Sequence, residues 1–254
     1  VYSVNGTLIA EYAIEKRLFI PYESIPKKLI NSFLSAEDKN FFSHPGIDAK
    51  GILRAVINNF KNVINNKRLE GASTITQQVA KNFLLTNEIS LKRKIKEAIL
   101  AFRIEKAYSK ERILELYLNQ IYLGEGTYGI AAASLQYFDK SVKELDYSES
   151  ALLAALPKAP SKYNPFKHKE EAKIRRNLVL NNLQENSFIN KKELIQLKNK
   201  KIILKKRKIK IFNEANSYSE EVRRITNENY GFKKLYADGL AIKVPLDVKY
   251  QIAA

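Results

Sequence analysis

The spacing of apolar residues along this chain predicts a mainly helical protein. From residue 25 onward, apolar side chains recur every three or four positions in most segments, which is the period of a helix with one buried face. The two ends differ. Residues 1–10 form two strand-like runs around an Asn-Gly turn, which is a hairpin signal, and residues 240–247 again have the pattern of a strand. We therefore expect helices between two short β-rich ends.

One helical run leads into residues 35–48, where chemically reactive side chains are concentrated. Glu37 and Asp38 fall near the predicted C-terminus of this helix, where the helix dipole disfavours negative charge. Two phenylalanines follow, and the sequence His44-Pro-Gly ends the helix. Carboxylates in such surroundings are expected to have raised pKa values, as a general acid or base requires. The alternative is a solvated Glu-Asp pair at a helix end.

The segment Ile52–Ile64 carries another apolar stripe, and its pattern fits two interpretations. Mostly Asn, Lys and Arg lie opposite the stripe. The helix can pack this stripe against a core, or it can lie in a membrane interface with its lysines near the headgroups. Periodicity does not separate the two.

Residues 71–82 predict a helix with an unusual polar face. Thr74 and Gln77 have capping-box spacing, which indicates that the helix begins here. Three apolar residues are expected in the core: Ile75, Val79 and Phe83. The opposite face combines hydroxyl and amide groups with one ammonium: Thr74, Gln77, Gln78 and Lys81. Such a row suits an oxygen-rich anionic substrate such as a sugar phosphate, and the alternative is an ordinary exposed face.

A third carboxylate, Glu97, lies in the helix predicted for 91–108. The main apolar stripe of that helix consists of Leu91, Ile95, Ala98, Ile99 and Phe102. Glu97 lies roughly opposite this stripe, between two cations and apolar neighbours, so its face is not plainly solvated. The alternative is an i, i+4 ion pair with Arg93, worth only ~0.3–0.5 kcal/mol.

Composition restricts the classes of partner. The chain has 254 residues and a net charge of +17, which implies an anionic partner. Much of the excess charge lies in residues 198–210, which lack the interleaved aromatics of single-strand binding surfaces. Nucleic acid is therefore not the favoured partner, and a solvated basic face is. The absence of cysteine excludes disulfides and thiolate metal sites.

The sequence also bears on how much of a protein this is. Because it contains no methionine, we expect a segment of a longer protein. No apolar run approaches 18 residues, so no transmembrane helix is predicted. Pro157, Pro160 and Pro165 mark the end of the compact region, and we expect a boundary near Lys200–Phe212.

Taken together, these motifs resemble the transglycosylase domain of class A penicillin-binding proteins, glycosyltransferase family 51. The resemblance covers about Val1 to Arg176 and rests on five motifs in order. They are Glu37-Asp38 with Phe41 and His44-Pro45-Gly46; Gly71–Gln78 with Lys81-Asn82; Arg93-Lys94 with Glu97; Ile113–Asn119 through Gly129 to Tyr137-Phe138; and Glu149 with Leu156–Pro160 and Tyr163–Pro165. The tail after Gly239 resembles a linker toward a transpeptidase domain whose Ser-x-x-Lys and Lys-Thr-Gly motifs do not occur here.

This resemblance implies a lysozyme-like, two-lobed fold. The glycosyltransferase domain would span 1–200, with a membrane-facing lobe at about 45–70 and a linker region at 201–254. The implied reaction polymerises lipid II with inversion, and undecaprenyl pyrophosphate leaves. The implied partners are lipid II, the growing glycan, the membrane surface and other cell-wall synthesis proteins, without nucleic acid. The implied location is the outer face of a bacterial inner membrane, with the anchor helix outside this segment.

The resemblance also assigns roles by position. Glu37 would be the base that deprotonates the acceptor 4-hydroxyl. Glu97 would be a second essential carboxylate near the pyrophosphate or a bound divalent cation, Mg²⁺ or Mn²⁺. The remaining substrate-binding positions are Lys81, Arg93 and Lys94 around the pyrophosphate, and Asp38, Ser73, Thr74, Gln77, Gln78 and Asn119 along the cleft.

Three positions depart from the family pattern, and one of them is Ala155, which replaces a common glycine. Ile89 stands where many members have an arginine that contacts the pyrophosphate, and Lys92 is the candidate substitute. Asp139 replaces the usual glycine after Tyr-Phe, but aspartate still tolerates a left-handed cap.

Two other functions compete with this one. A lytic or hydrolytic peptidoglycan-cleaving enzyme would use the same scaffold and also needs carboxylates. The cations around residues 74–81 argue against it, because a hydrolase has no pyrophosphate to hold. An inactive scaffold or a nucleic-acid binder would rest on the net charge alone, and the presence of both carboxylates argues against it.

Overall fold

The computed structural model describes residues 1–12, 16–64, 73–84, 90–205, 215–236 and 240–253. The chain forms two compact units. One combines Val1–Lys16 with Lys206–Ala254, and the other is Arg17–Lys205. The division expected from the sequence placed residues 1–16 with the larger unit instead. The two divisions differ because the backbone of Tyr2 hydrogen-bonds to Ile242 and Val244 in the C-terminal segment.

The smaller unit is built on that pairing. Tyr2 donates its N–H to the carbonyl of Ile242 at 2.8 Å and accepts from the N–H of Val244 at 2.9 Å. The predicted N-terminal hairpin is confirmed, since Tyr2 also pairs antiparallel with Leu8. A small core of Val1, Ile9, Ala10, Ala215 and Val244 holds the segments together. Two helices complete the unit: α10 (Asn216–Tyr236) and α11 (Val248–Ala253).

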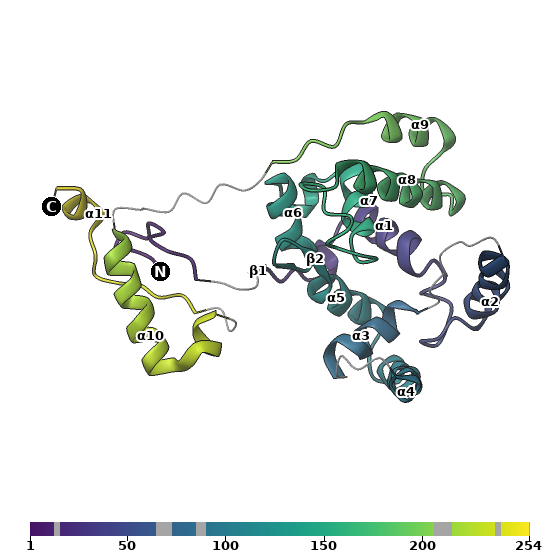
Figure 1. Ribbon diagram of the computed structural model, residues 1–254, viewed down its shortest axis with the longest axis horizontal. Helices are drawn as coiled ribbons and strands as arrows, with labels where there is room; N and C mark the ends of the chain where they lie inside the picture. The colour runs from purple at the N-terminus through teal and green to yellow at the C-terminus, as the bar shows by residue number, and fades with distance from the viewer. Residues whose placement is uncertain (13–15, 65–72, 85–89, 206–214, 237–239, 254) are drawn as a thin grey trace. The chain divides into compact units, whose positions relative to one another are not determined.

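The larger unit is mainly helical, as the periodicity predicts (Figure 1). Its α-helices are α1 (Lys27–Glu37), α2 (Ala49–Ile64), α3 (Ile75–Leu84), α4 (Leu91–Ala107), α5 (Lys110–Gln120), α6 (Ile130–Phe138), α7 (Tyr147–Ala155), α8 (Lys169–Glu185) and α9 (Lys191–Asn199). Short 3-10 turns occupy η1 (Tyr22–Ser24) and η2 (Val142–Glu144). A three-stranded sheet has the order β1 (Lys16–Arg17), β3 (Thr127–Tyr128), β2 (Tyr122–Gly124).

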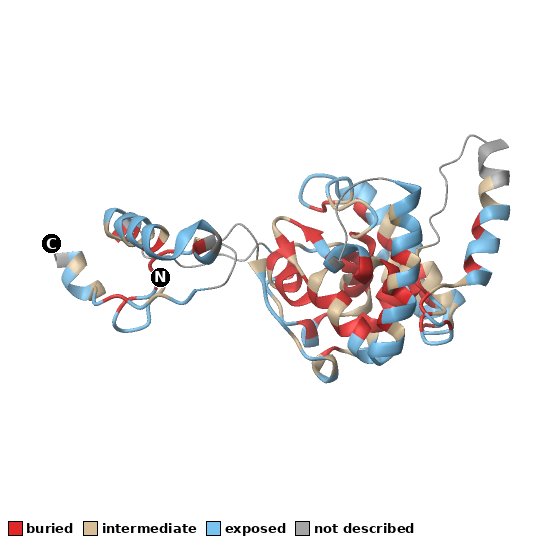
Figure 2. Ribbon diagram, turned by 90° about the horizontal axis from the view of Figure 1, so that it is seen from below, coloured by how far each residue is buried: buried red, intermediate tan, exposed pale blue. Residues whose placement is uncertain are grey.

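Two groups of packed helices form the core of this unit. Helix α1 packs against α7 and α8, and α3 packs against α4 and α5. Every residue from Ser150 of α7 to its C-cap Leu156 is buried, and the serine and alanines among them let α1 and α8 approach closely. Figure 2 shows the buried residues gathered inside the unit, while the described side chains of α2 are mostly exposed. This packing brings the C-terminus of α1 beside the N-terminus of α3.

Helices α2 and α4 present apolar side chains to solvent. On α2, Leu53 is 63% exposed and Val56 is 60% exposed, while the side chains of residues 60–64 lie outside the described set. The main apolar stripe of α4 is exposed as well: Leu91, Ile95, Ile99 and Phe102. Its buried face is instead the one that carries Glu97, Ala101 and Ile104. No helix in the described ranges combines the length and the apolar character that crossing a bilayer requires.

Candidate active site

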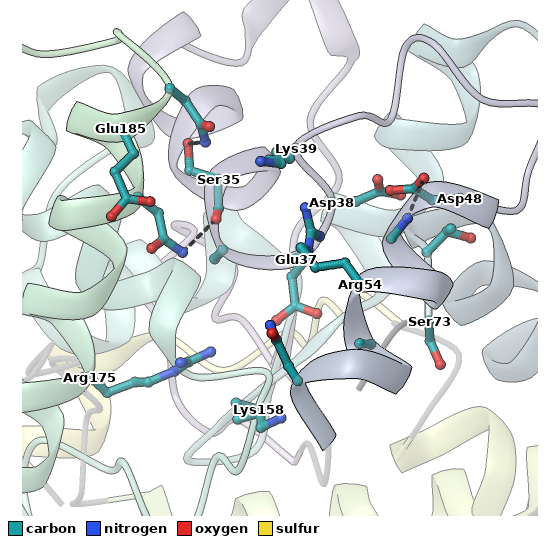
Figure 3. Close-up of a pocket in the computed structure, with 17 residues that line it drawn as sticks. Ser35, Glu37, Asp38, Lys39, Asp48, Arg54, Ser73, Lys158, Arg175 and Glu185 are labelled. Atoms are coloured by element: carbon teal, nitrogen blue, oxygen red, sulfur yellow. Dashed lines mark hydrogen bonds between the residues drawn. The ribbon is translucent and has the colours of Figure 1, made fainter. Parts of the chain in front are cut away.

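A cavity of about 490 Å³ opens at the C-terminus of α1. Glu37 is the last residue of that helix, and Figure 3 shows its carboxylate in the middle of the lining. Four cationic side chains line the same cavity: Lys39, Arg54, Lys158 and Arg175. In the part of the chain that the structure describes, none of the four pairs with a carboxylate. The cavity therefore offers cations to an anionic ligand.

The surroundings of Glu37 suit a general base. Burial raises the pKa of Glu37 above its ordinary value, and the neighbouring Asp38 raises it further. A hydrogen bond from Gln78 and the charges of Arg175 and Lys158 act in the opposite direction. The amide of Gln78 donates to the Glu37 carboxylate at 2.8 Å. A carboxylate with a raised pKa is a stronger base when ionised, and the amide fixes its orientation.

Asp38 makes hydrogen bonds within the protein that hold the loop after α1 and the start of α3. The Nε2 of His44 lies 3.0 Å from both of its carboxylate oxygens, and the N–H of Ile75 donates to one of them at 3.0 Å. The N–H of Gly46 donates to Nδ1 of His44, so the ring proton lies on Nε2 and points to Asp38. Asp38 thereby joins the end of α1 to the start of α3, which places Gln78 opposite Glu37.

The second predicted carboxylate, Glu97, lies in a separate polar cluster that meets the cavity through Ser73. Glu97 is 2% exposed, with the ammonium of Lys94 at 2.7 Å and a guanidinium nitrogen of Arg93 at 3.5 Å. Lys94 also donates to the hydroxyl of Ser73 at 2.7 Å, and Ser73 lines the cavity. The structure thus brings together four of the predicted residues, with Glu97 orienting the two cations.

These surroundings do not fit a metal ion held by protein ligands alone. Glu97 supplies a single carboxylate, and both of its near neighbours are cations. Across the described ranges, no group of three or more His, Cys, Asp or Glu residues is arranged to hold a metal ion. The donor set therefore suits an anionic ligand better than a divalent cation.

Lys81 lies at a second cavity, of about 360 Å³. Asn82 lines it too, together with Arg17 and the tyrosines Tyr122 and Tyr128. The two tyrosine rings lie 5.0 Å apart, and the guanidinium of Arg17 lies 4.2 Å from the Tyr128 ring centroid. Helix α3 thus borders one cavity near its N-terminus and another near its C-terminus.

Comparison with known proteins decides the family. A family model described as Transglycosylase matches residues 5–184. The chain belongs to the transglycosylase family. It is similar to penicillin-binding protein 1A of Rickettsia prowazekii (49% identity, 99% of this chain, 32% of that protein) and of Aquifex aeolicus (45%, 99% and 34%). The crystal structure of penicillin-binding protein 1A from Haemophilus influenzae matches with a TM-score of 0.57 and 26% identity, over 98% of this chain and 27% of that one.

This transglycosylase is therefore a glycosyltransferase domain of the class A penicillin-binding type, with the mainly helical fold of that group. The chain spans about a third of the length of the curated relatives named above.

Two residues of the predicted polar face of α3 shape the backbone of this transglycosylase. The capping box is confirmed: Gln77 accepts from the N–H of Thr74 at 3.0 Å, and Thr74 accepts from the N–H of Gln77 at 3.2 Å. The hydroxyl of Thr74 also donates to the carbonyl of Gly46 at 2.6 Å. Both side chains are buried, whereas Gln78 is half-buried and Lys81 is exposed, so the four residues of the predicted row do not share one environment. On the other face Ile75 and Val79 are buried as predicted, whereas Phe83 is 45% exposed.

Asn119 is another predicted cleft residue whose side chain is occupied. Its amide accepts from the N–H of Ile20 at 2.8 Å and donates to the carbonyls of Ile20 and Glu115, both at 2.9 Å. It therefore fastens the segment before α1 to α5. The structure places it in the framework of the fold and not in the lining of either cavity.

The sequence analysis did not single out the two cations that act electrostatically on Glu37. Lys158 occurs in the Pro157–Pro160 motif, but nothing in its local pattern shows that it faces a carboxylate more than 100 positions away. Arg175 lies on α8, in a helix that reads as charged throughout. Both cations approach Glu37 because α1 packs against α7 and α8, and such tertiary contacts do not appear in a local sequence pattern. Ile89 lies outside the described residues, and Lys92 is exposed on α4.

Proposed function

We propose that this transglycosylase polymerises lipid II into peptidoglycan strands, with Glu37 as the general base. Glu37 takes the proton of the acceptor 4-hydroxyl while that oxygen attacks the anomeric carbon of the donor sugar. The bond from this carbon to the pyrophosphate oxygen breaks, and its electron pair leaves with undecaprenyl pyrophosphate. A single displacement of this kind inverts the anomeric carbon.

One observation carries the proposal: a carboxyl group with a raised pKa shares its cavity with unpaired cations. Lys158 and Arg175 both act electrostatically on Glu37. The Nε of Arg175 is buried and has no hydrogen-bond partner among the described residues, so a phosphate oxygen of a bound substrate would satisfy it. Each charge-assisted contact to a phosphate is worth ~1.5–3 kcal/mol.

The cluster around Glu97 supports a second anion-binding function. Lys94 and Arg93 converge on Glu97, and Lys94 also reaches the cavity wall at Ser73. One oxygen of Glu97 and the Nε of Arg93 are buried without a hydrogen-bond partner in the described part of the chain. We assign Arg93 and Lys94 to the pyrophosphate, and Glu97 to holding them in place.

Hydrolysis of finished glycan is the weaker candidate. It requires two available carboxyl groups across the scissile bond, one as acid and one as base or nucleophile. Among the described carboxylates that line the cavity with Glu37, Asp38 is bound by His44 and the N–H of Ile75, and Asp48 accepts from Asn40 and the N–H of Gly51. That leaves the exposed Glu185 on α8 as the second carboxylate that a hydrolase would have to use. A free cation also has no obvious task on a neutral glycosidic bond.

The test is glycan synthesis from lipid II, measured with and without a chelator. Glu37→Gln keeps the size of the side chain but cannot accept the proton, so turnover should fall by ~10²–10⁴-fold with the melting temperature unchanged. Glu185→Gln, a carboxylate on the α8 side of the same cavity, serves as the control. If Glu37→Gln kept more than about a tenth of wild-type turnover, the role of Glu37 would be wrong. Release of soluble fragments from finished glycan would favour the hydrolase.

We further propose that α2 and α4 contact the surface of the bacterial inner membrane, on its outer face. Both helices expose apolar stripes, and on α4 the flanking exposed residues include Lys92, Lys96 and Arg103. The acidic side chains of α4, Glu97 and Glu105, are not among its exposed residues. An apolar stripe edged by cations is typical of a helix that lies in an anionic lipid interface.

A further inference from the structure

Another carboxylate–ammonium pair lies outside the lining of the Glu37 cavity and takes no part in the reaction proposed above. Glu105, near the end of α4, and Lys110, at the start of α5, are 2.8 Å apart, and their side chains are only 9% and 19% exposed. Removing two charges from water costs more than a pair usually returns. Lys110 also places a cation at a helix N-terminus, where the dipole disfavours it. The pair is therefore not explained by the stability of α5.

The contacts of the pair explain its position better. The ammonium of Lys110 donates to the backbone carbonyl of His44 at 2.6 Å and lies 4.5 Å from the ring centroid of Phe41. The carboxylate of Glu105 accepts from the hydroxyl of Thr76 at 2.5 Å. The pair thus joins α4 and α5 to both the loop after α1 and the first turn of α3.

These contacts connect to a series of hydrogen bonds that ends at Glu37, the proposed base. His44 holds Asp38, and Asp38 holds the N–H of Ile75 at the start of α3. One turn further along α3, Gln78 holds Glu37. The loop packs tightly against α4 at Gly46, where a Cβ would lie 3.0 Å from Cγ of Glu105 and 3.1 Å from the carbonyl of Ala101. The backbone of Gly46 also has a φ of +95°, which L side chains rarely adopt, so glycine is strongly favoured there.

We infer that Glu105 and Lys110 are positioning residues, which fix the loop 38–46 and α3 so that Gln78 meets Glu37. The inference rests on the proposed function, since it concerns the orientation of the proposed base. Neither residue lines the cavity that would hold the substrate. They act through the His44 carbonyl and the Thr76 hydroxyl, and a displacement of α3 by a fraction of an ångström is enough to lengthen the bond between Gln78 and Glu37.

Such a displacement has a consequence that simple destabilisation does not have. The hydrogen bond from Gln78 lowers the pKa of Glu37, so weakening it raises that pKa. The base is active when ionised, and the acid limb of the kcat profile should therefore move to higher pH. The other charged or titratable groups that act on Glu37 are Asp38, Arg175 and Lys158, and the buried hydroxyl of Tyr117 faces it from α5.

The experiment compares three variants of the intact chain by lipid II turnover, pH profile and melting temperature. Lys110→Met removes the ammonium, and Lys110→Arg keeps a donor for the His44 carbonyl. The double variant Glu105→Met/Lys110→Met replaces the pair by apolar groups of similar size, which avoids leaving one buried charge alone. Lys140→Met is the matched control, because it breaks a partly buried pair with Glu149 (2.6 Å) away from α3.

We expect Lys110→Met to lower kcat by ~10- to 100-fold, with KM changed by less than about threefold and the acid limb shifted to higher pH. Lys110→Arg should regain part of kcat. The double variant should recover the melting temperature that Lys110→Met loses. Its kcat should stay low, because the His44 carbonyl and the Thr76 hydroxyl still lack their hydrogen-bond partners. Lys140→Met should affect the melting temperature alone.

The inference is overturned if Lys110→Met melts earlier but keeps the wild-type kcat and pH profile, or if the double variant regains wild-type kcat. Either result would make the pair purely structural. A failure of the proposed function looks different: the wild-type chain would not extend lipid II, or Glu37→Gln would turn over at the wild-type rate.

Discussion

Replacing Asn119 by alanine separates a structural role from a substrate-binding role at a single position. Resemblance to the family assigns Asn119 to the cleft, whereas its amide makes three hydrogen bonds within the protein at 2.8–2.9 Å. Two of them hold the backbone of Ile20, and in the described part of the chain the amide of Asn119 is the hydrogen-bond partner of the Ile20 N–H. Alanine removes all three bonds at once and leaves these groups to compete for water.

The magnitude follows from the number of bonds. Each is worth ~0.5–1.5 kcal/mol net, so three give roughly 1.5–4.5 kcal/mol. Ile20 is only half-buried, and water compensates part of the loss, so we expect ~2–3 kcal/mol for Asn119→Ala. For a unit of this size that corresponds to a fall in melting temperature of about 5–10 °C. Turnover per folded molecule should stay within about twofold, because the amide does not line either cavity.

The assay pairs urea unfolding with lipid II kinetics at a temperature where each variant is folded. Asn119→Asp keeps the acceptor for the Ile20 N–H but replaces the donor by a charge among carbonyls, and it should destabilise at least as much. Asn199→Ala, on an exposed residue of α9, should change stability by less than ~0.5 kcal/mol. An unchanged stability together with a KM raised more than about tenfold in Asn119→Ala would refute the structural role.

Three further outcomes are expected. The kcat/KM of the wild type should fall as pH drops through the raised pKa of Glu37. The hydrogen bond from Gln78 lowers this pKa, so Gln78→Leu should raise it and move the acid limb of the profile to higher pH. A limb that moves to lower pH contradicts the assignment of Glu37 as the base. Tyr117→Phe should leave stability unchanged or raise it by up to ~1–3 kcal/mol in urea unfolding, because the Tyr117 hydroxyl is buried without a partner among the described residues and burial holds its pKa well above 10. Replacing Leu53 and Val56 by serine should weaken sedimentation with anionic liposomes at a nearly constant melting temperature, whereas a large fall would show that the stripe is core.

Local chemistry made part of this site predictable. The apolar run of α1 and the break after it place Glu37 at a helix end, and the structure puts it there. The spacing of Thr74 and Gln77 identifies the start of α3 through a hydrogen-bond pattern that involves neighbours only. Asp139 ends α6 at φ 53° and ψ 41°, the left-handed cap that its side chain was expected to tolerate. Each of these features depends on residues that are close together in the sequence.

Other features depended on contacts that a sequence pattern does not contain. Periodicity divides α4 into two faces but does not say which one is buried. Its apolar stripe is exposed, and the face with Glu97 is buried, because α3 covers the latter. In the same way, the amide of Asn119 looks free until Ile20, 99 residues earlier, is seen to occupy it. Lys158 and Arg175 reach Glu37 only because α7 and α8 pack on α1.

Helix α3 runs between the two cavities, so a substrate that contacts all the predicted residues has to be long enough to span them. From Thr74 to Lys81 the helix rises about 10 Å, so these side chains do not converge on one point. Gln78 reaches Glu37, while Lys81 borders the cavity that holds Tyr122 and Tyr128. A compact ligand in the cavity of Glu37 would not reach Lys81. A ligand that contacts both has to follow α3 for at least one further turn, about 5 Å, beyond Gln78. An elongated glycan with an anionic end meets that requirement, and its sugar rings would then pass the two tyrosines.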